Sequence, residues 1–447
     1  MKIKKAMALL LCIIMVLFCS GCSLNFFSVE SLMSPPHQEG KYGEVEKVFK
    51  KLMTDKSPQL KTPVYGDYQT AYILKDVDAN GIEEAFVFYT ETAVDANVRM
   101  ALLEYINDSW VVAADVKGSG NGVYDVSFEN IDDDGNLEVL VAWTLFDTKA
   151  TGVVSVYDIC KGDKGVLQIN TIGNEYYNSK SVLDFNGDGK KDIVLVYLDD
   201  SGTVQQSYFR CFSVSPSLEL VKYSELKISA SISSVSAIQN DSLKTESGEY
   251  RRVFIDCLKT DNTMFTELIY WNNADLTAHR SIKKPADSTL RSSKIICRDI
   301  DADGILEIPV NTKICGDPDA LTVKKDNAYF SFTMLQWQNA FGDKSEGNIY
   351  TVFNPIDLYL YRVTRVGEVT VRYDAFKQSL LFCIWDEESK QIKDELFSIT
   401  YRKSEDDEAG KELHFSGAGN YYYSITGYGE DFGLTDEGIK SSFIIID

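Results

Sequence analysis

The chain has 447 residues and a formal net charge of −22 at pH 7, and 44% of its residues are hydrophobic. That length and apolar content allow more than one buried core. The strong negative charge repels phosphate backbones, so nucleic acid is excluded as an expected partner and cations are favoured.

The N-terminus predicts export and attachment to a membrane. The basic start MKIKK precedes the apolar stretch Ala6–Cys19, which is shorter than the roughly 20 residues of a membrane span. The tail CSGC, ending at Cys22, resembles a bacterial lipobox, and this resemblance implies lipidation of Cys22. We expect residues 1–22 to be a lipoprotein signal peptide, with the body on the extracytoplasmic face of the bacterial cell membrane. The alternative is an uncleaved N-terminal anchor.

Residues 23–61 are expected to hold a tether and one helix. The segment SLMSPPHQEGK is polar and contains Pro and Gly, as in a linker. Within residues 42–55, Val45, Val48, Phe49 and Leu52 follow the i, i+3, i+4, i+7 spacing of an amphipathic helix. We expect this helix to pack on the edge of the main domain.

The next part of the chain contains an internal repeat. The segments DVDANGIEEAFV, NIDDDGNLEVLV, DFNGDGKKDIVL and DIDADGILEIPV align without gaps and begin at Asp76, Asn130, Asp184 and Asp299. The first three lie 54 residues apart, and the larger last interval predicts a degenerate copy near residue 238. A strand precedes each segment and further strands follow it, so each unit holds about four strands, as a propeller blade does.

We therefore predict a mainly β fold: a calcium-loop β-propeller of at least five blades over residues 62–345. The alternatives are a chain of independent β-hairpin modules and a β-solenoid. Residues 349–447 lack the repeat and alternate in polarity, as in DLYLYRVT and SLLFCIWD. They predict a separate C-terminal accessory domain of α+β or β type.

The repeated segments have the ligand pattern of a cation site. Counted from the first polar residue, oxygen-bearing side chains occupy positions 1, 3, 5 and 9, and glycine occupies position 6. Alternating oxygens on a tight turn can surround a hard cation, and glycine permits the turn. The predicted metal ligands are Asp76, Asp78, Asn80 and Glu84 (loop one), Asn130, Asp132, Asp134 and Glu138 (loop two), Asp184, Asn186, Asp188 and Asp192 (loop three), and Asp299, Asp301, Asp303 and Glu307 (loop four).

An EF-hand is excluded, because it requires a bidentate Glu at position 12. That position holds Val87, Val141, Leu195 and Val310, and the flanking residues are typical of strands. We expect up to four structural calcium ions that hold turns together. The alternatives are calcium that bridges a partner and a catalytic metal. Loop four has the most acids and is expected to bind calcium most tightly.

An acid at position 9 followed by an aliphatic strand resembles the calcium loop of FG-GAP/VCBS-type repeats in integrin-α-like propellers. The resemblance covers roughly residues 70–345 and implies a propeller fold with calcium in the blade turns. The lipobox, the LMSPP segment and the first repeat also resemble a group of lipoproteins from Gram-positive anaerobic bacteria. That resemblance implies no established activity.

The remaining reactive residues give no enzyme signature. Six cysteines follow the lipobox without C-x-x-C spacing, and either they are core residues or Cys297 pairs with Cys315. The chain has three histidines, His37, His279 and His414, and no H-E-x-x-H, G-x-S-x-G or P-loop motif.

We predict a non-enzymatic, membrane-anchored lipoprotein that acts as a calcium-stabilised binding or scaffold protein. Its expected partner is a cell-wall glycan or a protein. The alternative is an extracytoplasmic hydrolase acting on glycan, with a carboxylate site in the propeller channel.

Overall fold

The computed structural model describes residues 40–53, 58–92, 97–145, 152–162, 165–245, 248–316, 321–325, 327–339, 349–403, 410–415 and 419–446. These residues form six antiparallel sheets of four or five strands, one two-stranded hairpin and four α-helices. The prediction of a mainly β fold is confirmed. The predicted signal peptide, Cys22 and the tether up to residue 39 lie outside the described residues. No helix in the described ranges has the length and apolar character needed to cross a membrane.

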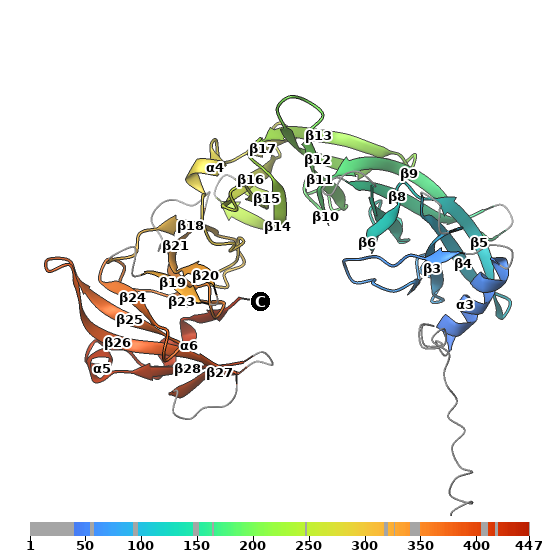
Figure 1. Ribbon diagram of the computed structural model, residues 1–447. Helices are drawn as coiled ribbons and strands as arrows, with labels where there is room; N and C mark the ends of the chain where they lie inside the picture. The colour runs from blue at the N-terminus through green and yellow to red at the C-terminus, as the bar shows by residue number, and fades with distance from the viewer. Residues whose placement is uncertain are drawn as a thin grey trace, which may run out of the picture.

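The first helix, α3 (Lys41–Leu52), lies where the periodic pattern predicts it. Val45 and Phe49 are buried against strands of the first sheet, and Val48 packs on the same cluster. The amphipathic face of the helix therefore covers the outer face of that sheet (Figure 1).

The first four sheets follow the chain in order. Sheet 1 contains β1 (Gln59–Leu60), β2 (Tyr72–Lys75), β3 (Glu84–Thr90), β4 (Arg99–Ile106) and β5 (Ser109–Lys117). Sheet 2 contains β6 (Gly122–Glu129), β7 (Glu138–Thr144), β8 (Gly152–Lys161) and β9 (Leu167–Tyr177). Sheet 3 contains β10 (Ser179–Leu183), β11 (Asp192–Asp199), β12 (Gln206–Val214) and β13 (Leu220–Ile228). Sheet 4 contains β14 (Ser234–Thr245), β15 (Gly248–Leu258), β16 (Met264–Asn272) and β17 (Thr277–Arg280).

The last two sheets have less regular strand orders. Sheet 5 has the order β18 (Ile308–Thr312), β21 (Thr333–Gln338), β22 (Ile349–Asn354), β23 (Tyr359–Arg362), β29 (Phe443–Ile445). Sheet 6 has the order β24 (Val369–Asp374), β25 (Ser379–Asp386), β26 (Gln391–Arg402), β28 (Asn420–Ile425), β27 (Lys411–Phe415). The other elements are the hairpin of β19 (Thr322–Lys325) and β20 (Ala328–Ser331), and the helices α4 (Pro285–Ser288), α5 (Gly427–Asp431) and α6 (Asp436–Ser441).

Sheet 5 crosses the boundary that we predict between two domains. Its strands β18 and β21 precede residue 345, whereas β22, β23 and β29 follow residue 348. The division into residues 62–345 and 349–447 stays a prediction.

The sheets stack face to face. This stacking explains why their middle strands are apolar at every position. In β7, Val139 and Val141 pack in a cluster with sheet 1, whereas Leu140 packs in a cluster with sheet 3. Side chains of a strand point alternately to its two faces, so a strand between two stacked sheets must be apolar at every position. The same alternation continues at β11 and β15, so sheets 2, 3 and 4 each share one core with the sheet before and another with the sheet after.

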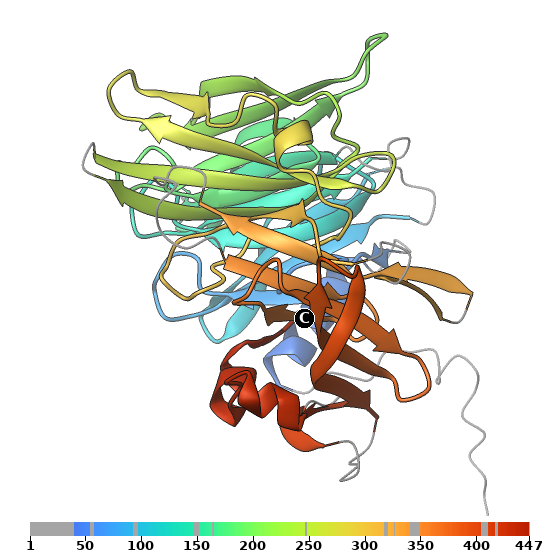
Figure 2. The same cartoon turned by 90° about the vertical axis from the view of Figure 1, so that its left-hand side faces the viewer.

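The stacked sheets follow a curved path rather than a closed one. Figure 1 shows an open arc, with sheet 1 at one end and sheet 6 at the other. Figure 2 shows the red helical segment with α5 and α6 at the end that holds sheet 6. No closed barrel or propeller is found in the described ranges, so the predicted propeller and its blade count stay predictions.

The segment near residue 238 forms the first half of sheet 4. Strands β14 and β15 pair from Ser234 with Leu258 to Thr245 with Gly248. This ladder continues through the positions at which the other units leave the sheet to form an acidic loop. Sheet 4 therefore has the four strands of a repeat unit and a hairpin in place of the loop.

Candidate metal centres

The four acidic loops share one backbone conformation. Their position-6 glycines, Gly81, Gly135, Gly189 and Gly304, all have a positive φ, between 85° and 96°. Position 4 also lies in the left-handed region, at Ala79, Asp133, Gly187 and Ala302. Two left-handed residues on alternate positions fold each loop tightly, and the glycines remove the steric cost at one of them.

The acid at position 9 has a structural role that is the same in every loop. The position-9 side chains are almost completely buried, with at most 6% of their surface exposed. One oxygen of each accepts a hydrogen bond from the backbone N–H of position 2, over 2.6–3.1 Å, in the pairs Val77 to Glu84, Ile131 to Glu138, Phe185 to Asp192 and Ile300 to Glu307. The side chains at position 2 are buried as well. The acid therefore closes the loop onto the sheet and leaves its second oxygen for another partner.

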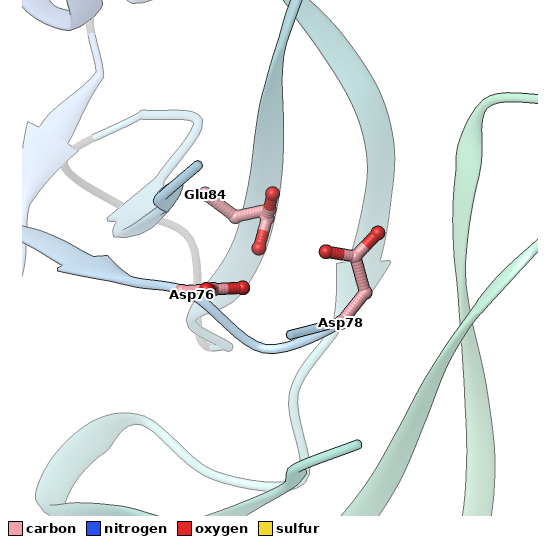
Figure 3. Close-up of side chains that lie close together, drawn as sticks. All are labelled: Asp76, Asp78 and Glu84. Carbon is pink, nitrogen blue, oxygen red and sulfur yellow. The ribbon is translucent and has the colours of Figure 1, made fainter. Parts of the chain in front are cut away.

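Loop one brings three carboxylates together. Asp76, Asp78 and Glu84 each offer an oxygen within 4.8 Å of the others, and Figure 3 shows the three groups facing a common space. Oε1 of Glu84 is buried and has no hydrogen-bond partner in the described part of the chain. Burial and the nearby Asp78 and Asp76 raise the pKa of Glu84 to about 7, against the lowering effect of its hydrogen bond from Val77.

Loop two repeats this arrangement. Oxygens of Asp132, Asp134 and Glu138 lie within 4.8 Å of one another. Oδ1 of Asn130, at position 1, is buried and lacks a hydrogen-bond partner in the described ranges. Burial raises the pKa of Glu138 to about 7, with contributions from Asp132 and Asp134.

Loop four forms a related cluster with a different membership. The oxygens within 4.8 Å of one another come from Asp299, Asp301 and Asp303. Glu307 lies at the closing position, and burial, with the charge of these three aspartates, raises its pKa to about 7. The expectation that loop four binds calcium most tightly stays a prediction.

Loop three differs from the other three. It forms no comparable group of three acidic ligands among the residues that the structure describes. The Asn186 amide donates to Asp188 over 3.1 Å, and the Arg251 guanidinium lies 3.4 Å from Oδ2 of Asp184. Burial raises the pKa of Asp192 to about 6. Arg251 thus supplies positive charge beside a predicted ligand.

Basic side chains from the next sheet also approach the first two loops. Nζ of Lys161 lies 3.3 Å from Asp78 in loop one, and Nζ of Lys190 donates to the backbone carbonyl of Asp132 in loop two over 2.8 Å. These contacts place the acidic loops at the junctions between stacked sheets.

A cluster of carboxylate oxygens suits a hard cation such as Ca²⁺. Burial and mutual repulsion disfavour the ionised acids, and a bound divalent cation would relieve both. The unpaired buried oxygens of Glu84 and Asn130 fit this interpretation, because they need a partner. No redox or nucleophilic group takes part in the clusters of loops one, two and four.

The other residues singled out in the sequence have ordinary environments. Cys297 and Cys315 are both free, as are the other four cysteines of the described ranges. His279 pairs with Asp275 over 2.8 Å at the surface, and His414 is exposed beside Tyr421. The neighbouring Tyr421, Tyr422 and Tyr423 are buried in sheet 6.

Comparison with known proteins adds no identification. No protein-family model matches the chain, and no curated protein matches it either.

Sequence reasoning missed two features of the loops. Position 4 needs a left-handed residue, and its signal is the small or turn-forming residue found there in all four copies. The contact from Arg251 had no local signal, since the arginine lies 67 residues after Asp184.

Proposed function

We propose that this chain is a membrane-anchored, extracytoplasmic lipoprotein that acts as a calcium-stabilised binding or scaffold protein. The observation that carries the proposal is the cluster of Asp76, Asp78 and Glu84, in which a buried carboxylate oxygen has no hydrogen-bond partner among the residues that the structure describes. The same geometry recurs in loop two, so a cation at these sites is a property of the repeat rather than of one loop.

The location of the loops supports a stabilising role for the cation. Each loop connects, or leads into, strands whose side chains fill the cores between sheets. Lys161 and Lys190 reach loops one and two from the following sheet, so the loops also affect how neighbouring sheets are held together. A cation that holds the loop would stabilise these junctions.

We also propose that the stacked sheets are the blades of a calcium-loop β-propeller of at least five blades, related to the FG-GAP/VCBS type. Three observations support this proposal: the 54-residue period, the four-stranded units and the face-to-face stacking. The anchor at Cys22 rests on the lipobox-like CSGC, and a cell-wall glycan or a protein is the partner that an extracytoplasmic location favours.

The test of calcium binding is thermal unfolding of the purified protein with Ca²⁺, with Mg²⁺ and with a chelator. Extracellular calcium modules bind with dissociation constants of about 10⁻⁴–10⁻³ M. One site at 100 times its dissociation constant adds about 2.7 kcal/mol to the free energy of unfolding. We expect Ca²⁺ to raise the melting temperature and Mg²⁺ to raise it less. A melting temperature that is unaffected by chelation would contradict the proposal.

The variant Glu84→Gln tests loop one directly. Gln keeps an oxygen for the Val77 N–H but removes the charge that a cation needs, so the calcium-dependent rise in melting temperature should shrink. Its matched control is Glu83→Gln, because Glu83 is the adjacent residue and forms an exposed pair with Lys41. Equal loss of the calcium effect in both variants would exclude Glu84 as a ligand.

The anchor is tested separately with Cys22→Ala in a bacterial host. We expect the wild-type protein to incorporate labelled fatty acid and to fractionate with membranes, and the variant to do neither. A variant that still carries the label would exclude Cys22 as the lipidation site.

A further inference from the structure

The guanidinium of Arg251 makes two contacts with the first residue of loop three. Its Nη1 donates to the backbone carbonyl of Asp184 over 3.3 Å, and its Nη2 lies 3.4 Å from Oδ2 of the same residue. Arg251 belongs to β15 of sheet 4, so its positive charge reaches loop three from the next sheet. The arginine therefore lies directly against a residue that the sequence pattern predicts as a metal ligand.

A glycine in loop three makes room for this arginine. Position 4 of loop three is Gly187, whereas the other loops carry a side chain there, at Ala79, Asp133 and Ala302. A Cβ on Gly187 would lie 2.9 Å from Nε of Arg251, which is closer than a carbon atom normally approaches. The arginine side chain thus packs against the bare backbone of the loop, and the loop sequence is suited to this contact.

The oxygens of loop three are engaged by donors of the protein itself. The Asn186 amide donates to Asp188 over 3.1 Å, and the N–H groups of Phe185 and Asn186 both donate to Oδ2 of Asp192. Asp192 is also one methylene shorter than the glutamate at position 9 of the other loops. Loops one, two and four each bring three carboxylates together, and loop three does not among the described residues.

A lysine beside loop one provides a contrast. Nζ of Lys161 lies 3.3 Å from Asp78, but the lysine side chain is 56% exposed, and the three carboxylates of loop one still lie together. The Arg251 side chain is 36% exposed. Its guanidinium is a rigid fork of donors, which can hold a carbonyl and a carboxylate at once. Lys161 thus lies beside an intact acidic cluster, whereas Arg251 accompanies a loop without one.

The next residue, Arg252, stands where the other units have the position-9 acid. The two residues after it, Val253 and Phe254, pack toward sheets 3 and 5, as the two residues after a position-9 acid pack toward the sheets before and after their own. Arg252 is fully buried, and its Nε donates to Asp241 over 2.7 Å. Asp241 also accepts from the N–H of Leu306, in loop four, over 2.8 Å. In this unit an arginine and its partner acid thus link the sheet to the following loop.

We propose that Arg251 replaces calcium in loop three, so that loops one, two and four bind calcium and loop three does not. A guanidinium is always charged and belongs to the chain, so it neutralises the loop at any calcium concentration. It also repels an incoming cation. The junction between sheets 3 and 4 is therefore held without calcium. This inference rests on the proposed binding of calcium in the other loops.

Hydrogen exchange of the full-length protein, with Ca²⁺ and with a chelator, tests the proposal loop by loop. Mass spectrometry of peptides that cover each loop gives the exchange rates. With free Ca²⁺ at ten times the dissociation constant, a loop that must release its ion to open exchanges about tenfold more slowly. We expect this protection in loops one, two and four, and equal rates with and without Ca²⁺ in loop three. Protection of all four loops would overturn this inference alone, whereas protection of none would overturn the proposed calcium binding as well.

The variant Arg251→Gln tests the role of the arginine. The side chain is partly exposed, so the variant should fold, and the loss of its charge should make loop three a calcium site. We expect Ca²⁺ to slow exchange in loop three by about tenfold in this variant, with the other loops unchanged. The control Arg210→Gln removes the same charge from sheet 3, where Arg210 pairs with Glu225 and Glu175. A loop three that still ignores Ca²⁺ in Arg251→Gln, or that responds equally in the control, would exclude Arg251 as the replacement.

Discussion

At the residue scale, the acidic loops depend on two kinds of position. Glycine at position 6 adopts a conformation that other L-residues reach only at a cost, and position 4 is left-handed even where it is alanine. The position-9 acid then ties the loop to the sheet through the N–H of position 2. The backbone conformation and the position-9 acid thus fold the loop tightly without a cation. A bound cation would stabilise a loop that already has this shape.

The variant Gly304→Ala isolates the backbone contribution to such a loop. A Cβ at Gly304 would contact nothing within 4 Å, but φ is +87°, so the methyl group adds backbone strain and little steric conflict. We expect the free energy of unfolding to fall by about 1–2 kcal/mol, measured by urea denaturation in a chelator. The control is Gly202→Ala, where the added Cβ makes an ordinary contact and φ is not positive. An equal effect at both glycines would contradict this explanation.

At the element scale, every sheet face needs a covering element. Sheets 2 to 4 are covered on both faces by their neighbours, whereas the outer face of sheet 1 has none. Helix α3 covers it, with Phe49 set edge-on against Tyr89 at 5.0 Å and near Tyr72. The helix thus completes the core of the first sheet at the end of the stack.

The variant Phe49→Ala tests the importance of this cover. Phe49 is 2% exposed, so its removal leaves a cavity between helix and sheet. Truncation of a buried Phe costs about 3–5 kcal/mol, and we expect a loss of this size in urea denaturation. Tyr42→Ala, on the same helix and 39% exposed, is the control and should change stability by less than about 1 kcal/mol. Similar losses in both variants would show that the helix does not act through this contact.

At the scale of the whole molecule, the junctions between sheets differ in kind. Sheets 1 to 4 join through large apolar clusters, whereas the cluster between sheets 4 and 5 has four buried members, Phe254, Leu268, Cys297 and Ile308. A buried ionic network adds to it. Arg291 and Asp256 pair over 2.7 Å with no exposed surface, and the N–H of Cys297 donates to the same aspartate over 2.8 Å. This junction thus combines a small apolar contact with specific polar contacts.

Arg291→Met is expected to weaken the junction strongly. The change leaves Asp256 buried without its cation, and breaking one side of a buried pair costs about 3–5 kcal/mol. We expect the free energy of unfolding, measured by urea denaturation, to fall by that amount. The backbone amides of β18 should also exchange hydrogen faster. The exposed pair of Arg372 and Glu395 gives the control Arg372→Met, which should cost less than about 1 kcal/mol. Equal losses would show that the network contributes no more than a surface pair.

The local features of this protein could be predicted from its residues alone. The 54-residue period, the strand after each loop and the left-handed glycine follow from patterns within a few residues, because a nine-residue loop closes on itself. The mainly β fold follows from the same periodicity. The sequence also predicts the degenerate unit near residue 238, but it does not predict the hairpin that stands there in place of an acidic loop.

The remaining features depend on contacts between distant residues, which no local pattern specifies. The stacking of sheets decides which acid is buried, why Glu84 has a free oxygen, and why Arg251 lies beside Asp184. The local sequence therefore determined the loops and their potential ligands. The tertiary structure decided which oxygens and which cations meet, because burial and charge depend on the neighbours that folding brings together.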